Sequence, residues 1–253
     1  MRLLHIDIET APHIAYIWGL RDKFIPLDRL IDPGYTLCWA AKWHGKRNPV
    51  LFRSLHSHGK EDMIHTVHAL MEEADAVVHY NGNKFDVPVL NQEFLFLDLP
   101  PPAPAKQIDL LRTARGRFRL PSNKLDYVAQ VLGLGNKVKH KGMSLWHDCM
   151  QGDPKAWRIM ERYNKKDVLL LERVYNKLLP WIPNHPNRAL YIDSPTKPVC
   201  PSCGSTHLHS RGLEHTKTMS YRRYQCQGCG TWSRSRVNVT SPEHKAHTLV
   251  GIK

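Results

Sequence analysis

The 253-residue chain lacks any stretch near the roughly 20 uninterrupted apolar residues that a membrane-spanning helix needs. Its first ten residues carry acids inside their apolar run, so we expect no secretory signal there. No internal repeat is evident, and cysteine is scarce, with six in the whole chain. We therefore expect a cytoplasmic protein with reduced thiols and no membrane role. As a small basic chain, it is further expected to work in a bacterial or phage-infected cell.

Acidic residues are also few, with 23 Asp and Glu against 36 Lys and Arg and a net charge of +13. Residues 184–253 hold ten of the basic residues and only three of the acidic ones. A basic chain attracts polyanions, of which nucleic acid is the commonest. Simple solubility is the alternative reading of the charge.

Hydrophobic patterns predict an α/β domain over residues 1–182, built on a mixed five-stranded sheet with flanking helices. Strands are expected at 3–8, 35–43, 50–55 and 75–80, with a fifth ending near 108–111; the first three form a meander. Helices are expected at 60–73, at 87–97, from a Ser122 cap to Leu132, and from an Asp153 cap to Leu178.

Five prolines between residues 180 and 198 exclude a helix there and favour a stiff extended linker. We place this linker at 183–198. A small module at 199–236 and a polar tail at 237–253 are expected to follow it.

Acids lie at three separate places in the predicted α/β domain. Asp7 and Glu9 alternate on the first strand and therefore leave the same face. Burying two carboxylates is costly unless a cation compensates, and a divalent metal ion is the obvious candidate. A solvated strand end is the alternative interpretation.

The second acid, Asp86, follows an Asn-Gly turn at the end of a strand, where ligands collect in α/β sheets. It could instead be only a helix N-cap. Tyr163 and Asp167 are neighbours on one face of the long helix, and that face continues its apolar stripe. Asp167 is therefore expected to point inward and to need a cation, unless it is a surface acid paired with lysine.

Together these segments resemble the DEDD superfamily of 3'→5' exonucleases, whose fold is ribonuclease H-like. The resemblance covers roughly residues 1–180. Tyrosine rather than histidine in the last motif marks the DEDDy branch, which includes the exonuclease domains of family B polymerases. The matching positions are Asp7 and Glu9, then Asn81, Phe85 and Asp86, and then Tyr163 and Asp167.

The resemblance implies two Mg²⁺ or Mn²⁺ ions as cofactors. Asp7 would bridge both ions, Glu9 and Asp167 would complete one site, and Asp86 would help to hold the other. Tyr163 would hold the attacking water rather than take its proton, since the usual tyrosine pKa is about 10.

Several further residues could serve a bound nucleic acid. Asn81 and Phe85 belong to the second motif, and basic residues ahead of the long helix could grip phosphates. An ordinary solvated loop is the alternative for these basic residues, which are Lys124, Lys137, Lys139, His140 and Lys141. Asp109 is expected to cap a helix, and the histidines show no metal-like spacing.

Two Cys-x-x-Cys pairs, 22 residues apart, predict a tetrahedral zinc site made of Cys200, Cys203, Cys226 and Cys229. A redox pair is the alternative, but neither pair opens a βαβ unit. Metal binding would supply the folding free energy of so short a module. Cys38 and Cys149 are expected to be core thiols.

The cysteine module is similar to the zinc ribbons of transposase-type DNA-binding proteins. Basic and aromatic residues interleave in it, a pattern suited to single-stranded nucleic acid, and the expected contacts are Arg222, Arg223, Tyr224 and Trp232. A ribbon that only stabilises the fold or docks a protein is the alternative.

We therefore expect a two-metal-ion 3'→5' exonuclease that acts on single-stranded DNA or frayed 3' ends. Open alternatives are an exoribonuclease, a structure-specific endonuclease on the same scaffold, and a nucleic-acid-binding module with an inactive nuclease fold. A monomer is expected, with any polymerase or other replication or repair partner supplied in trans.

Overall fold

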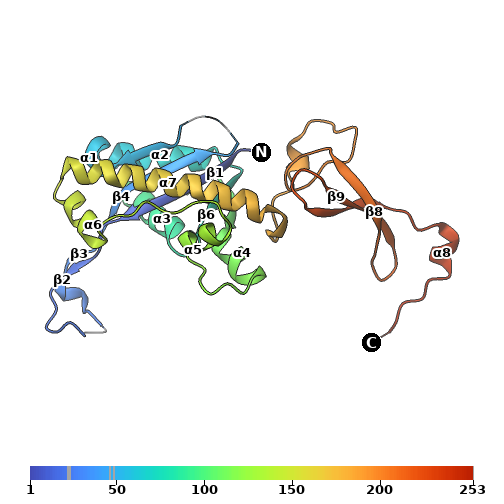
Figure 1. Cartoon of the computed structure of the whole chain (residues 1–253), viewed down its shortest axis with the longest axis horizontal. Coiled ribbons are helices and arrows are strands. Elements are labelled where there is room, and N and C mark those ends of the chain that lie inside the picture. The colour runs from blue at the N-terminus through green and yellow to red at the C-terminus, as the bar shows by residue number, and fades with distance from the viewer. Residues whose placement is uncertain (22–23, 46, 48, 253) are drawn as a thin grey trace. The chain divides into compact units, whose positions relative to one another are not determined.

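The computed structural model describes residues 1–21, 24–45, 47 and 49–252. It divides into two compact units, residues 2–175 and residues 176–253 together with Met1 (Figure 1). The division lies inside the long helix α7 Pro154–Leu178, shortly before the predicted boundary at residue 182. Among the described residues, no helix has the length and apolar character to cross a membrane.

The first unit is built on a five-stranded sheet with the order β5-β4-β1-β6-β7. Strand β4 is antiparallel to both β1 and β5, whereas β6 and β7 continue the sheet in parallel. The predicted mixed sheet, with its meander first, is thereby confirmed. The strands are β1 Leu3–Thr10, β4 Thr36–Trp43, β5 Leu51–Ser54, β6 Ala76–His79 and β7 Lys106–Asp109.

Helices cover both faces of this sheet (Figure 1). They are α1 Leu55–His58, α2 Lys60–Glu72, α3 Asp86–Phe96, α4 Leu110–Arg117, α5 Leu125–Val131, α6 Met143–Met150 and α7 Pro154–Leu178. The described residues also form short 3₁₀ turns, η1 Leu27–Arg29 in the first unit and η2 Leu179–Trp181 and η3 Arg188–Tyr191 in the second.

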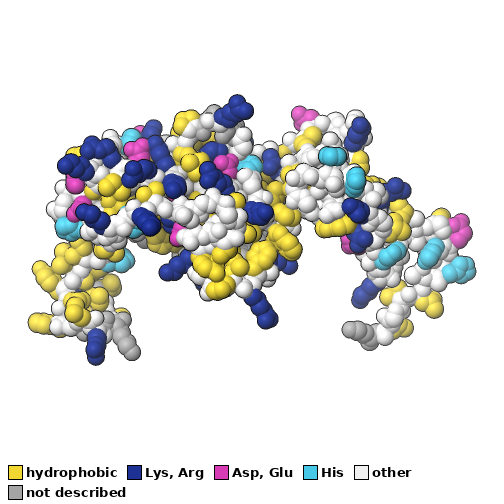
Figure 2. Space-filling view, viewed as in Figure 1, with side chains coloured by type: hydrophobic (Ala, Val, Ile, Leu, Met, Phe, Trp, Pro, Cys, Tyr) yellow, Lys and Arg dark blue, Asp and Glu magenta, His cyan; other side chains and the backbone are white. Residues whose placement is uncertain are grey.

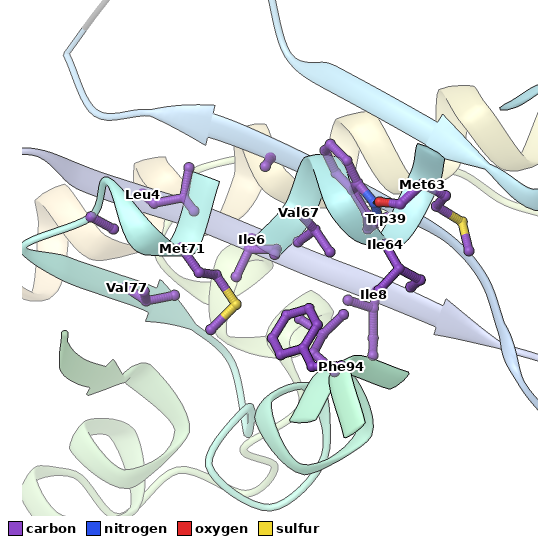
Figure 3. Close-up of a cluster of buried hydrophobic side chains, with 13 residues drawn as sticks. Leu4, Ile6, Ile8, Trp39, Met63, Ile64, Val67, Met71, Val77 and Phe94 are labelled. Atoms are coloured by element: carbon purple, nitrogen blue, oxygen red, sulfur yellow. The ribbon is translucent and has the colours of Figure 1, made fainter. Parts of the chain in front are cut away.

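Strand β1 separates the hydrophobic core from the candidate site. Its even-numbered residues Leu4, Ile6 and Ile8 are buried and pack with α2 and α3 (Figure 3). Because successive strand residues point to opposite faces, the odd-numbered residues face the other way. The Asp7 side chain accordingly meets α7, as the hydrogen bond from Asn164 shows.

The structure differs from the sequence prediction in one helix cap and in several elements. Helix α5 is capped at Lys124 rather than Ser122, whose hydroxyl accepts a hydrogen bond from the Lys124 amide at 3.3 Å. Helix α6 was not predicted, nor were the short strands β2 Ile14–Ala15 and β3 Leu30–Asp32. Hydrophobic side chains gather over the β2–β3 arm (Figure 2), and the exposed ones include Tyr16, Trp18, Leu20 and Phe24.

The second unit carries a three-stranded antiparallel sheet in the order β10-β9-β8. Its strands are β8 Leu208–His215, β9 Ser220–Cys226 and β10 Trp232–Asn238. The segment predicted as a polar tail begins inside β10 and contains a short helix, α8 Pro242–Ala246, which Ser241 caps. The tail is therefore partly structured.

Candidate metal centre and nucleic-acid surfaces

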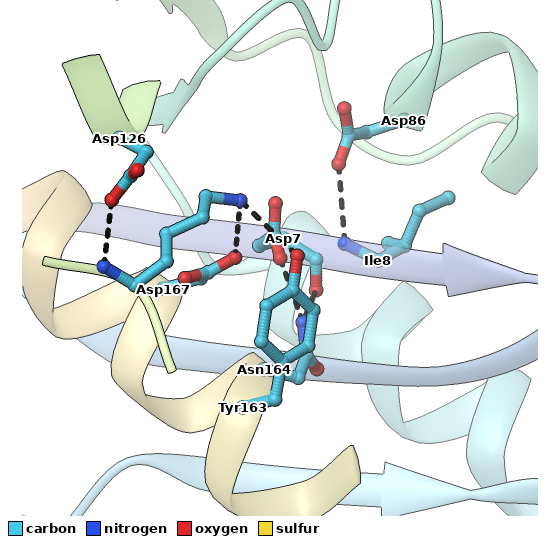
Figure 4. Close-up of polar contacts among 8 residues, drawn as sticks. Asp7, Ile8, Asp86, Asp126, Tyr163, Asn164 and Asp167 are labelled. Atoms are coloured by element: carbon cyan, nitrogen blue, oxygen red, sulfur yellow. Dashed lines mark hydrogen bonds and ion pairs between the residues drawn. The ribbon is translucent and has the colours of Figure 1, made fainter. Parts of the chain in front are cut away.

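Three predicted site residues converge between β1 and α7. One carboxylate oxygen each of Asp7, Glu9 and Asp167 lies within 4.8 Å of the others. Asn164, one helical turn before Asp167, fixes the strand against the helix (Figure 4). Its Nδ2 donates to the Asp7 carboxylate at 2.7 Å and to the Asp7 carbonyl oxygen at 3.3 Å.

Crowding and burial make these carboxylates harder to ionise. Burial, together with the charge of Glu9, raises the pKa of Asp7 well above its usual range. Burial raises the pKa of Glu9 to about 8, although Lys137 opposes the shift. The pKa of Asp167 is raised as well, again by burial. A group of acids whose pKa values are all raised is short of positive charge.

Lys137 supplies part of that charge. Its Nζ lies 2.6 Å from Asp167 Oδ2 and 3.2 Å from the Tyr163 hydroxyl. Its backbone N–H donates to Asp126 Oδ1 at 2.8 Å, which anchors this irregular segment. Burial lowers the pKa of Lys137, but the charge of Asp167 opposes this and the net shift is upward. Lys137, predicted as a phosphate contact, thus pairs with a carboxylate.

Asp167 Oδ1, the carboxylate oxygen that does not meet Lys137, shows whether a metal ion fits the site. The side chain is fully buried. Its Oδ1 has no hydrogen-bond partner among the residues that the structure describes. A buried carboxylate oxygen without a donor is costly, and hard divalent cations take such oxygens as ligands. The residues present therefore fit a divalent ion.

Asp86 lies at the edge of β1, next to the backbone of Ile8 (Figure 4). It lies outside the group of three carboxylates, and its Oδ1 accepts a hydrogen bond from the Ile8 amide at 3.2 Å. Burial raises its pKa to about 7. The N-cap position of α3 belongs to Phe85, whose side chain is 41% exposed. Asp86 is therefore the first residue of α3 and not its N-cap.

The turn before Asp86 is held from both sides. Asn81 has a φ of 75°, a conformation that asparagine tolerates, and its amide donates to Asp109 Oδ1 at 3.0 Å. A Cβ at Gly82 would lie 2.3 Å from the His79 ring, so only glycine fits there. Asp109 also caps α4 through the Leu111 amide, which confirms its predicted role.

Tyr163 is 6% exposed and lies in an aromatic cluster. The ring of His140 is 4.9 Å away edge-on, and the ring of Trp146 is 6.1 Å away. Burial, followed by the charge of Glu9, raises the pKa of Tyr163 well above its usual range. The phenol therefore stays protonated at any working pH.

Two cavities flank this cluster. The first, of about 610 Å³, is lined by Asp7, Lys137 and Asn81 together with polar residues that include Tyr80, Arg115 and Lys124. The second, of about 530 Å³, is lined by Lys139 and Lys141 together with His140, Lys155 and Arg162, beside two acids, Asp148 and Asp153. Both volumes are in the range of ligand-binding clefts.

The four cysteines of the second unit form one cluster. Their Sγ atoms lie within 4.8 Å of one another, with Cys200 to Cys229 at 3.6 Å and Cys203 to Cys226 at 3.5 Å. The two knuckles have the same turn, because Gly204 and Gly230 both have positive φ near 80°. This cluster fits a zinc ribbon. Cys38 and Cys149 are buried free thiols, as predicted.

The ribbon sheet divides the four predicted nucleic-acid contacts between two faces. Strand pairing places Arg223 opposite Arg234, so that Tyr221, Arg223, Trp232 and Arg234 share one face. On this face the Arg223 guanidinium lies 4.9 Å from the Trp232 ring centre and that of Arg234 lies 4.1 Å from the Tyr221 ring centre. We call these four residues the stacking face. Arg222 and Tyr224 belong to the opposite face.

Comparisons with known proteins agree with this architecture. A sequence model of the RNase_H superfamily matches residues 35–179. A similar solved structure is the family B DNA polymerase from the hyperthermophilic archaeon Pyrobaculum calidifontis, with a TM-score of 0.53 and 21% identity. The similarity covers 71% of this chain and 24% of the polymerase, and it bears on the fold alone. No curated protein matches the chain.

Proposed function

The chain belongs to the RNase H superfamily, and from this premise we propose that it is a divalent-metal-dependent 3'→5' exonuclease. Its proposed substrate is single-stranded DNA or a frayed 3' end. The observation that carries the proposal is the convergence of Asp7, Glu9 and Asp167, with one buried Asp167 oxygen lacking a hydrogen-bond partner within the described part of the chain.

In this proposal Asp7, Glu9, Asp86 and Asp167 hold two Mg²⁺ or Mn²⁺ ions. Bound in pairs, such ions activate water and stabilise the leaving oxygen of a phosphodiester. Asn164 keeps the Asp7 carboxylate in place through the 2.7 Å hydrogen bond. Without that contact the acid could turn away from its neighbours.

Tyr163 and Lys137 have different proposed roles beside the carboxylates. The Tyr163 phenol remains protonated, so it donates a hydrogen bond to the attacking water and orients it. The Lys137 ammonium, paired with Asp167 in the structure, compensates the acids and is close enough to meet a substrate phosphate.

The proposed substrate path follows the two cavities. The cavity beside Asp7 has room for the terminal nucleotide, and the basic cavity lined by Lys139 and Lys141 suits the phosphates of the strand. The ribbon, folded around one structural Zn²⁺, would bind the same strand through its stacking face and raise the local substrate concentration.

The proposal extends to the cellular context. The protein would act as a cytoplasmic monomer in a bacterial or phage-infected cell. Because the solved structure with a similar fold is a DNA polymerase, a polymerase or another replication or repair protein is the partner we propose in trans.

The direct test uses single-stranded DNA and RNA labelled at either end, with Mg²⁺, Mn²⁺ or neither. We expect a ladder that shortens from the DNA 3' end, requires metal, and is at least about 100-fold weaker in Asp7→Asn. Asp98→Asn is the matched control, since Asp98 is exposed and its φ of 54° suits asparagine. Cleavage of RNA alone would indicate an exoribonuclease, and a single internal cut would indicate an endonuclease. No cleavage would indicate a binding module.

A further inference from the structure

A second set of metal-ligating side chains faces α7, two residues before Asp7 on β1. His5 Nε2, His44 Nδ1 and a Glu172 carboxylate oxygen lie within 4.8 Å of one another. The three residues come from β1, from the residue that follows β4, and from α7. His5 is fully buried. None of the three takes part in the proposed hydrolysis.

The measured distances match the edges of a tetrahedral site. His5 Nε2 lies 3.2 Å from His44 Nδ1, which lies 3.5 Å from Glu172 Oε1. Zinc–nitrogen and zinc–oxygen bonds of about 2.0–2.1 Å place neighbouring ligand atoms about 3.3–3.4 Å apart. The ligand atoms therefore need little movement to surround one ion.

One contact of 3.2 Å joins the two histidine rings of this cluster. Two imidazole nitrogens and a carboxylate oxygen face a common space, and neutral rings can place only one N–H between the two nitrogens. His5 Nδ1 is buried and has no hydrogen-bond partner within the described residues, so no contact there fixes the tautomer of this ring. In the tautomer that carries the proton on Nδ1, the Nε2 lone pair can bind a metal.

Lys42 is the feature that opposes a metal ion. Its Nζ lies 2.8 Å from Glu172 Oε2 and 2.9 Å from Glu172 Oε1. The Gly45 amide donates to the same Oε1 at 3.0 Å. Because a carboxylate has two oxygens, Lys42 can keep Oε2 while Oε1 turns to the ion. The ammonium then orients Glu172 but weakens metal binding through its charge.

We propose that His5, His44 and Glu172 bind one Zn²⁺, separate from the carboxylate centre and from the four cysteines. Two imidazoles and one carboxylate favour zinc over Mg²⁺, which prefers oxygen ligands alone. The ion would connect β1, the end of β4 and α7 at positions two residues before Asp7 and five residues after Asp167. Its role is to hold these elements in place.

The test measures bound zinc in the full-length protein, dialysed against a series of buffered free Zn²⁺ concentrations with excess Mg²⁺ to fill the carboxylate centre. We expect two zinc ions per chain, one in the ribbon and one in the histidine site. His44→Gln should retain only one, with affinity for the second lowered at least about 100-fold, since outer-shell partners alone contribute 10–100-fold. His65→Gln, at an exposed position, should retain both.

Lys42→Gln should raise the zinc affinity of the histidine site, because it removes the competing ammonium. A wild-type protein that holds only one zinc at saturation overturns the proposal, as does a second zinc unaffected by both His44→Gln and Glu172→Gln. The wild-type stoichiometry decides the matter even if a variant fails to fold. Nuclease activity is not the readout, so the result is independent of the proposed reaction.

Discussion

At the scale of single residues, Lys137 supplies positive charge to the cluster of acids. Its ammonium lies 2.6 Å from Asp167 Oδ2 and is 30% exposed, whereas Asp167 is fully buried. Removing one partner of such a pair leaves a buried charge uncompensated, which costs about 3–5 kcal/mol. Lys137 and a metal ion therefore stabilise the same carboxylates by the same means.

Replacement of Lys137 should accordingly have opposite effects on stability and on metal response. We expect Lys137→Gln to lose about 2–4 kcal/mol of unfolding free energy without Mg²⁺ and to gain a larger stabilisation from added Mg²⁺ than the wild type. Denaturant titrations with and without Mg²⁺ measure both quantities. Lys139→Gln, at an exposed lysine, is the control; equal behaviour of the two variants would contradict this role of Lys137.

The raised pKa of Glu9 predicts a pH-dependent stability without Mg²⁺. Burial raises this pKa from 4.5 to about 8. The folded state therefore keeps a proton that the unfolded chain releases, so stability present below pH 4.5 is lost as the pH rises through about 8. Glu9→Gln removes this titration: it should resemble the wild type near pH 4.5 and exceed it in stability at pH 8. A pH-independent difference between the two proteins would refute the assignment.

At the scale of elements, β1 and α7 supply most of the site through two different periodicities. The strand repeat of two places Asp7 and Glu9 on one face, and the helical repeat places Tyr163 and Asp167 four residues apart. Both repeats are visible in sequence. The structure adds Asn164, which is buried and joins the two elements. The sequence around Asn164 did not predict that contact.

The turn before Asp86 leaves no room for a side chain at Gly82. We expect Gly82→Ala to destabilise the protein by about 1–3 kcal/mol, because its Cβ would overlap the His79 ring. Activity should fall at the same time, since Asp86 follows the turn. Gly116→Ala in α4 meets open space and should stabilise by up to about 1 kcal/mol. Thermal melts and activity of the two variants test this contrast.

The predictable elements are those with a strong local signal. Strand β1, helix α2 and helix α7 carry clear periodicity, and the turn at 81–82 is marked by its residues. Helix α6 follows Gly142 and has only two buried residues, Leu145 and Cys149, so its pattern is weak. The Lys137–Asp167 pair spans 30 residues through an irregular segment. Sequence spacing carries no information about contacts of that kind.

At the scale of the whole molecule, the ribbon is proposed to hold the strand that the first unit hydrolyses. Strand register, which the sequence did not reveal, assigns Arg223 and Trp232 to the stacking face and Arg222 to the other. One flat strand of nucleic acid can stack on only one of these faces. The predicted set of ribbon contacts is thus divided.

A charge-matched pair of variants tests which face binds. Arg223→Gln with Trp232→Ala should weaken binding of single-stranded DNA by about 10–100-fold, because base stacking contributes about 1–3 kcal/mol per base. Its salt dependence should also become shallower, since a phosphate contact is lost. Arg222→Gln removes the same charge from the other face and should change affinity little. A larger loss with Arg222→Gln would assign binding to the opposite face.

The most direct measurement is a crystal structure of the protein soaked in Mn²⁺, with anomalous difference maps to locate the ions. We predict one peak enclosed by Asp7, Glu9 and Asp167, with the Lys137 ammonium moved away from Asp167, and a second peak on the side of Asp7 that faces Asp86. Carboxylates without manganese, with Lys137 still paired to Asp167, would contradict the proposed metal-dependent nuclease.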